Sequence, residues 1–305
     1  MSSLGHRTVL VYDVGGSHIS AATCAEDNLT LSSIAKASQP ENGSVDAFLD
    51  LLFRLAAEAT PKLDSVAGAS FAMPGPFDYA EGVSWMKHKL PYLYGVSLRH
   101  AFAQRLGWDD GQVRFLNDAG AYLLGEIGAG AARGVERVAG FTLGTGIGSG
   151  FAIDGQLQFS GKGVPPGGEI WNVPFEGGIV EDLISTRSIK QRFLERTGKE
   201  LEVAEIAAQA AHGSAAAEVF QDFGRDLGRV LRIQLAAFAP QVAVLGGGIA
   251  QSAHLFLPAA KNELQGVALE LRIAELGDKA PLVGAGAAWF RSKDARRTES
   301  AIATS

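Results

Sequence analysis

An asparagine and an aspartate stand side by side where an apolar strand gives way to a helix. Residues 113–116 predict a short strand, Asn117 and Asp118 follow it, and residues 119–129 predict a helix. A carboxylate in this place can orient a hydroxyl group and accept its proton, and the neighbouring amide can both donate and accept hydrogen bonds. Asp118 is therefore a candidate general base. On the residues alone it could equally cap the following helix, and Asn117 could be a turn residue.

Three glycine clusters each follow an apolar strand. They are Gly15 and Gly16 with Ser17, Gly144, Gly146 and Gly148 with Thr145, and Gly246, Gly247 and Gly248. Such glycines can simply mark turns. Their backbone N–H groups can also form concave anion sites, because glycine tolerates positive φ and lets a phosphate approach closely. Neither the dinucleotide-binding fingerprint nor the P-loop motif is present. Phosphate-binding hairpins fit better, and Asp13, at the end of the first strand, could hold Mg²⁺ through water.

The elements that carry these residues form two similar patterns. A strand, a glycine turn and a second strand begin near residue 8 and again near residue 137, about 130 residues later. This weak duplication predicts two related α/β halves around a cleft. Between residues 160 and 180 lies a long irregular stretch with many Gly and Pro, of a kind that is usually functional.

Composition narrows the function classes. The chain has 305 residues, 47% hydrophobic and 20% charged, which is typical of a globular protein with two domains. A net charge of −6 argues against non-specific binding to nucleic acid and against a polybasic membrane anchor. A single cysteine, Cys24, excludes an intramolecular disulfide and a Cys-rich metal site. Without a signal-peptide or membrane-span pattern, the sequence predicts a soluble, cytoplasmic protein.

Six motifs in order resemble those of the ROK family (repressors, open reading frames and kinases), particularly its bacterial glucokinase branch, over residues 8–290. They are residues 13–17 and 143–150 for phosphate, 73–76 with Gly82 for the sugar-side loop, 117–119 for catalysis, 168–169 for the sugar, and 244–248 for adenosine. The resemblance implies an α/β protein with the actin-like ATPase (ribonuclease H-like) fold. Residues 1–118 plus 285–305 would form the smaller domain and residues 119–284 the larger one. It also implies a homodimer through the larger domain.

The resemblance implies an ATP-dependent sugar kinase that phosphorylates a hexose hydroxyl, with glucose and its 6-OH as the first expectation and Asp118 as the general base. The expected cofactors are ATP and Mg²⁺, with Asp13 as the metal residue. The three glycine clusters, including Ser17 and Thr145, would bind the nucleotide. The expected sugar-binding residues are Gly75, Asn117, Asp118, Glu169, Asn172 and Glu181. Glu181 could alternatively be only a favourable charge at the start of a helix.

One stretch departs from the family pattern. Many ROK proteins carry a zinc site of one histidine and three cysteines, but residues 171–181 contain no cysteine, and Asn172 takes the usual histidine position. No zinc is therefore expected, and packing must hold the loop. Trp171 and Phe175 could supply that packing or could stack on the sugar. His88 and Lys89, in a second departure at residues 87–89, could contact the substrate or be solvated loop residues.

Several alternatives to this function stay open. The sugar could be fructose, mannose, allose, N-acetylmannosamine or N-acetylglucosamine, because the family uses nearly the same residues for several of these. Polyphosphate could replace ATP, although no obvious basic track would bind it. A sugar-responsive repressor would need a DNA-binding domain, and only 12 residues precede Asp13. A non-catalytic sugar-binding regulatory protein is the last alternative.

Overall fold

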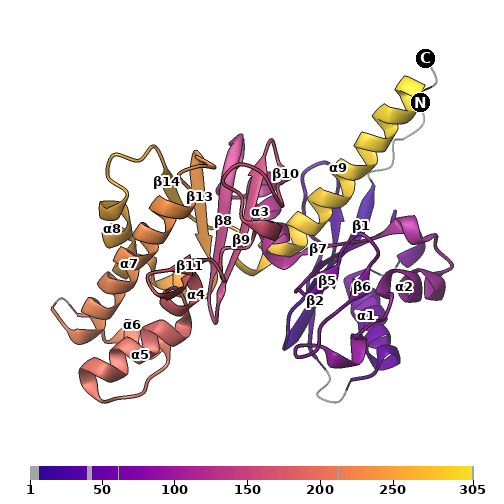
Figure 1. The fold of residues 1–305 in the computed structure, drawn as a ribbon. Helices are drawn as coiled ribbons and strands as arrows, with labels where there is room; N and C mark the ends of the chain where they lie inside the picture. The colour runs from indigo at the N-terminus through magenta and orange to yellow at the C-terminus, as the bar shows by residue number, and fades with distance from the viewer. Residues whose placement is uncertain (1–6, 40–42, 61, 212, 304–305) are drawn as a thin grey trace. The chain divides into compact units, whose positions relative to one another are not determined.

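The computed structural model describes residues 7–39, 43–60, 62–211 and 213–303 and divides into two compact units (Figure 1). Unit 1 comprises Met1–Ala129 and Lys279–Ser305, and unit 2 comprises Gly130–Asp278. The domain limits expected from the sequence reach residues 1–6 and 304–305, which lie outside the described residues.

Unit 1 is built on a five-stranded sheet with the order β3-β2-β1-β4-β7. β1 pairs antiparallel with β2 and parallel with β4, and β4 pairs parallel with β7. β1 forms because its run of Val, Leu and Tyr side chains is buried on both faces of the sheet, as a central strand requires. The strands are β1 (Thr8–Val14), β2 (His18–Ala25), β3 (Ala35–Ser38), β4 (Ala69–Met73) and β7 (Val113–Asn117), with a separate small pair of β5 (Phe77–Asp78) and β6 (Val83–Ser84).

The helices of unit 1 begin and end at sequence signals. The Ser44 side chain accepts a hydrogen bond from the Ala47 N–H and so caps α1, and Gly107 ends α2 with a φ of 64°. The helices are α1 (Val45–Ala59), α2 (Leu98–Leu106), α3 (Asp118–Ala129) and α9 (Ala280–Ala303), with 3₁₀ turns η1 (Leu63–Ser65), η2 (Pro91–Leu93) and η3 (Asp110–Gln112).

Helices α3 and α9 pack side by side in unit 1 (Figure 1). Two glycines allow this close approach: a Cβ on Gly125 would clash with the Ala280 carbonyl, and a Cβ on Gly284 would clash with the Ala121 carbonyl. The packing ties α3 to unit 1, so the unit boundary falls after Ala129. The boundary expected from the sequence lay after Asp118, at the first residue of this helix.

Unit 2 repeats the sheet of unit 1 with the order β10-β9-β8-β13-β14. β8 pairs antiparallel with β9 and parallel with β13, and β13 pairs parallel with β14. The strands are β8 (Arg137–Leu143), β9 (Ile147–Ile153), β10 (Gln156–Leu157), β13 (Val242–Gly246) and β14 (Glu270–Ile273), with a separate hairpin of β11 (Pro174–Phe175) and β12 (Gly178–Ile179). Strand order and direction therefore match between the units, as the two similar sequence patterns predict.

The helices of unit 2 cover a hydrophobic core of its own. Ser185 and Ser214 cap α5 and α7 by accepting hydrogen bonds from backbone N–H groups. The helices are α4 (Val180–Leu183), α5 (Thr186–Thr197), α6 (Val203–Ala208), α7 (Ala215–Gln234) and α8 (Ala253–Glu263), with 3₁₀ turns η4 (Pro166–Gly168), η5 (Ile249–Ser252) and η6 (Gly277–Lys279). In the part of the chain that the structure describes, no helix combines the length and the apolar character needed to span a bilayer.

Candidate active site

The parallel strands of unit 1 bring its predicted site residues to one edge of the sheet. Asp13 of β1 is in register with Ala72 of β4, and the next residue, Met73, is in register with Asn117 of β7. Neighbouring strands lie about 4.8 Å apart, so the end of β1 is roughly 10 Å from the end of β7. Asp13, the Gly75 loop and the Asn117–Asp118 segment thus share this edge, where loops of open α/β sheets bind ligands.

Asn117 caps α3. Its Oδ1 accepts hydrogen bonds from the backbone N–H groups of Ala119 and Gly120 at 3.0 and 3.1 Å. Its Nδ2 donates to the Tyr79 hydroxyl at 3.2 Å, and that hydroxyl donates to the Met73 carbonyl at 3.2 Å. These bonds fix the amide orientation, because the acceptor atom faces the helix. Sequence reasoning missed Tyr79, and no motif marks it.

Asp118 is the first residue of α3 and is partly exposed. Its Oδ1 accepts a hydrogen bond from the Ala119 N–H at 2.8 Å. The positive end of the helix dipole also favours the ionised form of a carboxylate at this position. The capping role that the sequence left open therefore falls mainly to Asn117, and Asp118 is held as an acceptor at the strand edge.

The first glycine turn, between β1 and β2, is exposed. The Gly15 N–H donates to the His18 carbonyl at 2.9 Å and closes the turn. Gln39 supports it from β3's end, with its N–H donating to the Ser17 carbonyl at 2.8 Å and its Nε2 donating to the Gly15 carbonyl at 3.0 Å. A Cβ added to Gly16 would meet no atom within 4 Å. The backbone beside Gly16 is therefore open to solvent.

The second glycine turn, between β8 and β9, has a carboxylate beside it. The Gly144 N–H donates to the Gly146 carbonyl at 3.0 Å, and Thr145 lies exposed between them. The Ile147 N–H donates to Glu181 Oε2 at 3.3 Å, and a Cβ on Gly146 would clash with that oxygen. The structure thus brings Glu181 to this turn. Gly148, in contrast, lies within β9, paired with Thr142.

The third cluster follows β13 and lies against the second turn. Gly246 is the last residue of β13 and is buried. Gly247 has a φ of 84°, and a Cβ on it would clash with the backbone carbonyl of Leu143, at the end of β8. Gly248 is exposed, with open space where its Cβ would lie. Unit 2 therefore presents bare backbone from two adjacent strand ends.

Glu169 and Asn172 lie exposed in the loop after η4. Glu169 Oε2 accepts a hydrogen bond from the Trp171 indole at 2.9 Å, and the Trp171 carbonyl accepts one from the Glu181 N–H at 3.0 Å. The buried Ser149 hydroxyl holds the loop by donating to the Gly168 carbonyl at 2.7 Å. Glu169, Trp171 and Glu181 are therefore linked in unit 2, and Asn172 adjoins them in sequence.

Comparison with known proteins shows the family of this chain. The ROK family model matches residues 9–293. The chain belongs to the ROK family. It is 29% identical to a glucokinase of Thermotoga maritima over 272 residues, which are 80% of this chain and 82% of the relative. The ROK hexokinase of Thermus thermophilus superposes with a TM-score of 0.79 at 27% identity, covering 94% of this chain and 99% of that one.

A second solved structure extends the comparison of folds. The ROK family glucokinase of Streptomyces griseus, in complex with glucose and AMPPNP, superposes with a TM-score of 0.72 at 23% identity, covering 92% of this chain and 98% of that one. The fold of the ROK family chain is thus the actin-like ATPase fold, as expected. Its relatives support the coarse assignment of a ROK sugar kinase.

In this ROK chain the loop of residues 171–181, which departs from the family pattern, has no cysteine that could bind a metal. β11 and β12 form a hairpin whose turn residues, Glu176 and Gly177, have φ values of 50° and 86°. Phe175 is 7% exposed and packs in the core of unit 2, whereas Trp171 is 40% exposed. Glu176 also pairs with Arg229 of α7. Packing and an ion pair therefore hold the hairpin.

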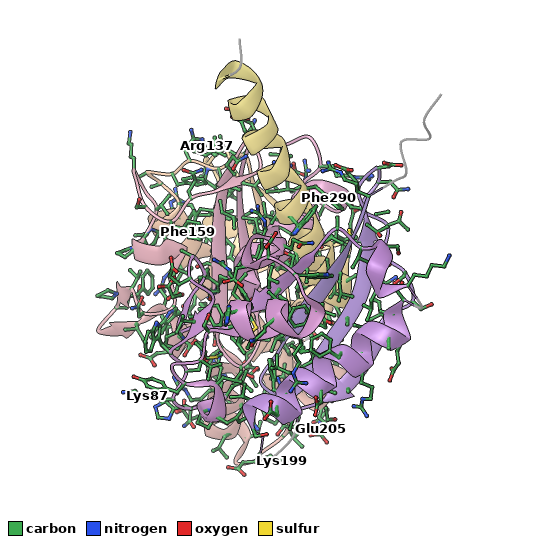
Figure 2. All side chains as sticks on the ribbon, turned by 90° about the vertical axis from the view of Figure 1, so that its right-hand side faces the viewer. Lys87, Arg137, Phe159, Lys199, Glu205 and Phe290 are labelled. Atoms are coloured by element: carbon green, nitrogen blue, oxygen red, sulfur yellow. The ribbon has the colours of Figure 1, made fainter. Side chains whose placement is uncertain are left out.

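Metal ligands are sparse in the described part of this ROK chain. No group of three or more His, Cys, Asp or Glu side chains there could hold a metal ion. The expected magnesium residue, Asp13, lies near the end of β1, and Mg²⁺ is usually bound by one or two carboxylates together with substrate phosphates and water. His88 and Lys89 are exposed, and neighbouring Lys87 lies at the molecular surface (Figure 2) with its Nζ 5.4 Å from the centre of the Tyr94 ring.

Proposed function

We propose that this ROK protein is an ATP-dependent sugar kinase that transfers the γ-phosphoryl group to a hexose hydroxyl, with the 6-OH of glucose as the first candidate. The observation that carries the proposal is the shared sheet edge of Asp13, Asn117 and Asp118 in unit 1. Asp13, a candidate metal ligand, and Asp118, a candidate base for a hydroxyl group, lie there at the ends of parallel strands. The likeness to a glucokinase supports the choice of glucose.

In this proposal Asp118 acts as the general base. Its carboxylate accepts the proton of the attacking hydroxyl, whose oxygen then bonds to the γ-phosphorus while the bond to ADP breaks. The role of Asn117 is to bind a neighbouring sugar hydroxyl through its amide group. Glu169, Asn172 and Glu181 would accept hydrogen bonds from further hydroxyls, and Gly75 would line the sugar loop.

The glycine clusters are assigned to the nucleotide. Backbone N–H groups of the two hairpin turns would bind phosphate oxygens, and the chain from Gly246 to Gly248 would pass beneath the nucleoside. Mg²⁺ supplies charge neutralisation on the phosphates when bound, with Asp13 holding it through water. ATP is proposed over polyphosphate because the overall charge is −6 and a polyphosphate would need a basic track.

A coupled ADP-release assay across glucose, fructose, mannose, allose and the N-acetylhexosamines tests the proposal. We expect turnover with one sugar to fall by about 10²–10⁴-fold in Asp118→Asn. The matched control is Asp50→Asn, a surface carboxylate of unit 1 whose side chain is 70% exposed. Near-normal turnover in Asp118→Asn would refute the mechanism. Sugar binding without turnover of any sugar would favour a regulatory protein instead.

A further inference from the structure

Trp171 is a large side chain in the loop after η4, and its indole group is bound to one of the proposed sugar-binding acids. The side chain is 40% exposed, and its Nε1–H donates a hydrogen bond to Glu169 Oε2 at 2.9 Å. Phe175, in the same loop, is buried in the core of unit 2 instead. A polar bond therefore places the indole of Trp171, whereas burial places the ring of Phe175.

The backbone on both sides of Glu169 is held by one buried hydroxyl group. Ser149 Oγ donates to the Gly168 carbonyl at 2.7 Å and accepts a hydrogen bond from the Ile170 N–H at 3.0 Å. Ser149 is 6% exposed, and Ile170 is fully buried. With its backbone fixed, Glu169 keeps mainly the rotation about its own side-chain bonds. The indole N–H restricts that rotation, because it binds the far end of the side chain.

Glu169 keeps acceptor capacity for a ligand. An ionised carboxylate has about four lone-pair sites on its two oxygens. The indole uses one site on Oε2. Glu169 is exposed, and it forms no ion pair with any residue that the structure describes. An acid that is already oriented accepts a hydrogen bond from a hydroxyl group at a lower entropic cost than one that must be ordered on binding.

The backbone of Trp171 is bonded to a second proposed sugar-binding acid. Its carbonyl accepts a hydrogen bond from the Glu181 N–H at 3.0 Å. The carboxylate of Glu181 has a different partner, the Ile147 N–H, which donates to Oε2 at 3.3 Å. Trp171 is thus bonded to Glu169 through its side chain and to Glu181 through its backbone. A change of the side chain should therefore disturb the first acid and leave the second in place.

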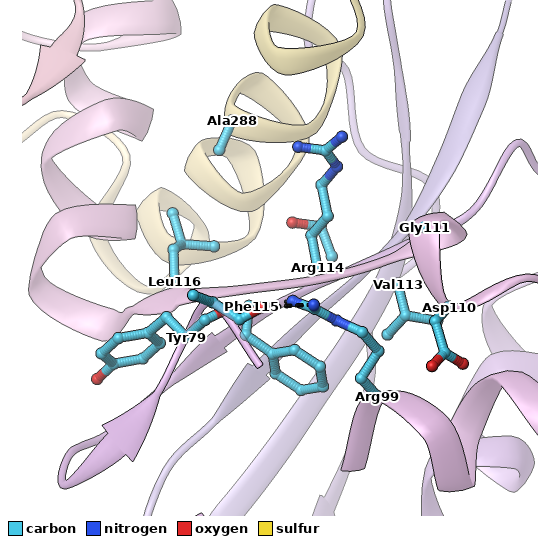
Figure 3. A pocket seen from close by; sticks show the side chains of 11 residues that line it. Tyr79, Arg99, Asp110, Gly111, Val113, Arg114, Phe115, Leu116 and Ala288 are labelled. Atoms are coloured by element: carbon cyan, nitrogen blue, oxygen red, sulfur yellow. Dashed lines mark hydrogen bonds between the residues drawn. The ribbon is translucent and has the colours of Figure 1, made fainter. Parts of the chain in front are cut away.

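Unit 1 has a comparable arrangement around Asn117. The Tyr79 hydroxyl accepts a hydrogen bond from Asn117 Nδ2 at 3.2 Å. Figure 3 shows Tyr79 with its hydroxyl group pointing away from the other residues drawn, and Arg99 donates to the Tyr79 carbonyl at 3.1 Å. In each unit an aromatic side chain with a polar end is bonded to a proposed sugar ligand.

We propose that Trp171 is a positioning residue for sugar binding, which holds the Glu169 carboxylate ready to accept hydrogen bonds from sugar hydroxyl groups. This role rests on the proposed function, since it takes Glu169 as a sugar ligand. It gives a task to the exposed aromatic residue of the loop that departs from the family pattern. The ligand must present hydroxyl donors to Glu169, because an ionised carboxylate can only accept hydrogen bonds.

Glucose titrations followed by protein NMR test this role, because they measure binding without turnover. Trp171→Phe keeps an aromatic ring and removes the N–H donor. We expect it to weaken glucose binding about fivefold, which corresponds to the ordering cost of one long side chain. The melting temperature should change little, since the indole is exposed. The matched control is Trp108→Phe, whose ring packs against Phe102 in unit 1 and which should bind glucose as the unaltered protein does.

Two double-mutant cycles separate positioning of Glu169 from general support of the loop. In a Glu169→Ala background, Trp171→Phe should cause no further loss of glucose binding, because the partner of the indole is gone. In a Glu181→Gln background, Trp171→Phe should cause the same loss as in the unaltered protein. The proposed role is wrong if Trp171→Phe binds glucose as tightly as the unaltered protein. It is also wrong if the loss persists in the Glu169→Ala background, or if the unaltered protein does not bind glucose.

Kinetics distinguish this role from the proposed function. Trp171→Phe should raise the KM for glucose and leave the KM for ATP unchanged. An equal rise in both KM values would overturn the role of Trp171 without affecting the assignment as a kinase. Glucose binding without turnover would refute the kinase proposal, whereas the binding cycles would still decide whether Trp171 positions Glu169.

Discussion

The sheets of units 1 and 2 have the same strand order and directions, yet the residues at equivalent strand ends differ in kind. The loop after β4 begins with Pro74, and Asn117 and Asp118 stand where β7 passes directly into α3. β13 is the equivalent of β4, and the loop after it begins with Gly247 and Gly248. Unit 1 thus presents side chains that suit hydroxyl groups beside its one glycine turn, whereas unit 2 presents bare backbone that suits phosphates from two adjacent strand ends. The scaffold positions the loops, and the loops carry the chemistry.

The largest effect on the free energy of unfolding is expected at Gly247. Gly247→Ala places a Cβ against the Leu143 carbonyl and forces alanine to a φ of 84°. The combined strain and overpacking should cost about 3 kcal/mol in the free energy of unfolding. Gly248→Ala is the control, because its Cβ would enter open space. Chemical denaturation measures both, and equal stabilities would mean that β8 and β13 do not meet as described.

A smaller effect on stability, with a larger effect on activity, is expected at the second glycine turn. Gly146→Ala should displace the Glu181 carboxylate, which is the mobile end of a side chain, at a cost of less than about 1 kcal/mol. The misplaced acid should lower kcat/KM about 10²-fold. Sugar kinetics and thermal melting, measured together, separate the two effects.

Gly16→Ala is the matched change in the first turn, where a Cβ meets no atom. Its stability should change by less than about 0.5 kcal/mol. Its KM for ATP should rise if a phosphate lies there, whereas Gly146→Ala should also raise the KM for the sugar, because it displaces Glu181. If the two variants changed the KM for ATP and the KM for the sugar in the same way, the two turns would not differ in the ligand they contact.

Tyr79→Phe tests the support of the unit 1 loops. It removes the hydroxyl that bonds to Asn117 and to the Met73 carbonyl, and should cost about 1–2 kcal/mol in stability. The KM for the sugar should rise while the KM for ATP stays unchanged. A rise in the KM for ATP alone would contradict the assignment of this loop to the sugar.

Gln39→Ala should give a modest loss of stability and no direct loss of a proposed ligand contact. It removes one side-chain hydrogen bond to the Gly15 carbonyl and leaves the backbone bond to Ser17, so about 1 kcal/mol is expected. Phe53→Leu in α1 would report ordinary packing losses for comparison. Denaturant midpoints of the unaltered protein, Gln39→Ala and Phe53→Leu rank the three by stability.

The sequence predicts the scaffold better than the support of the site. β1 and β7 and the start of α3 follow from apolar runs and from the polar residues that end them. The sequence could not show whether Trp171 or Phe175 packs into the protein core, because both are large apolar residues in one irregular loop. The structure buries Phe175 and leaves Trp171 half exposed. The partners of Asn117 and Gly146 were also missed, since Tyr79 and Glu181 lie 38 and 35 residues away in the chain.

The last helix has a consequence for protein synthesis. α9 contacts α3, β1 and β4, so the first 129 residues lack part of their core until the end of the chain has been made. Unit 2 is continuous from Gly130 to Asp278, so its whole core has been synthesised before α9 is made. On the ribosome, where segments fold as they emerge, unit 2 should therefore be complete before unit 1. Ribosome-bound chains stalled beyond residue 278 would show a protease-resistant unit 2 beside an N-terminal segment that is still cleaved.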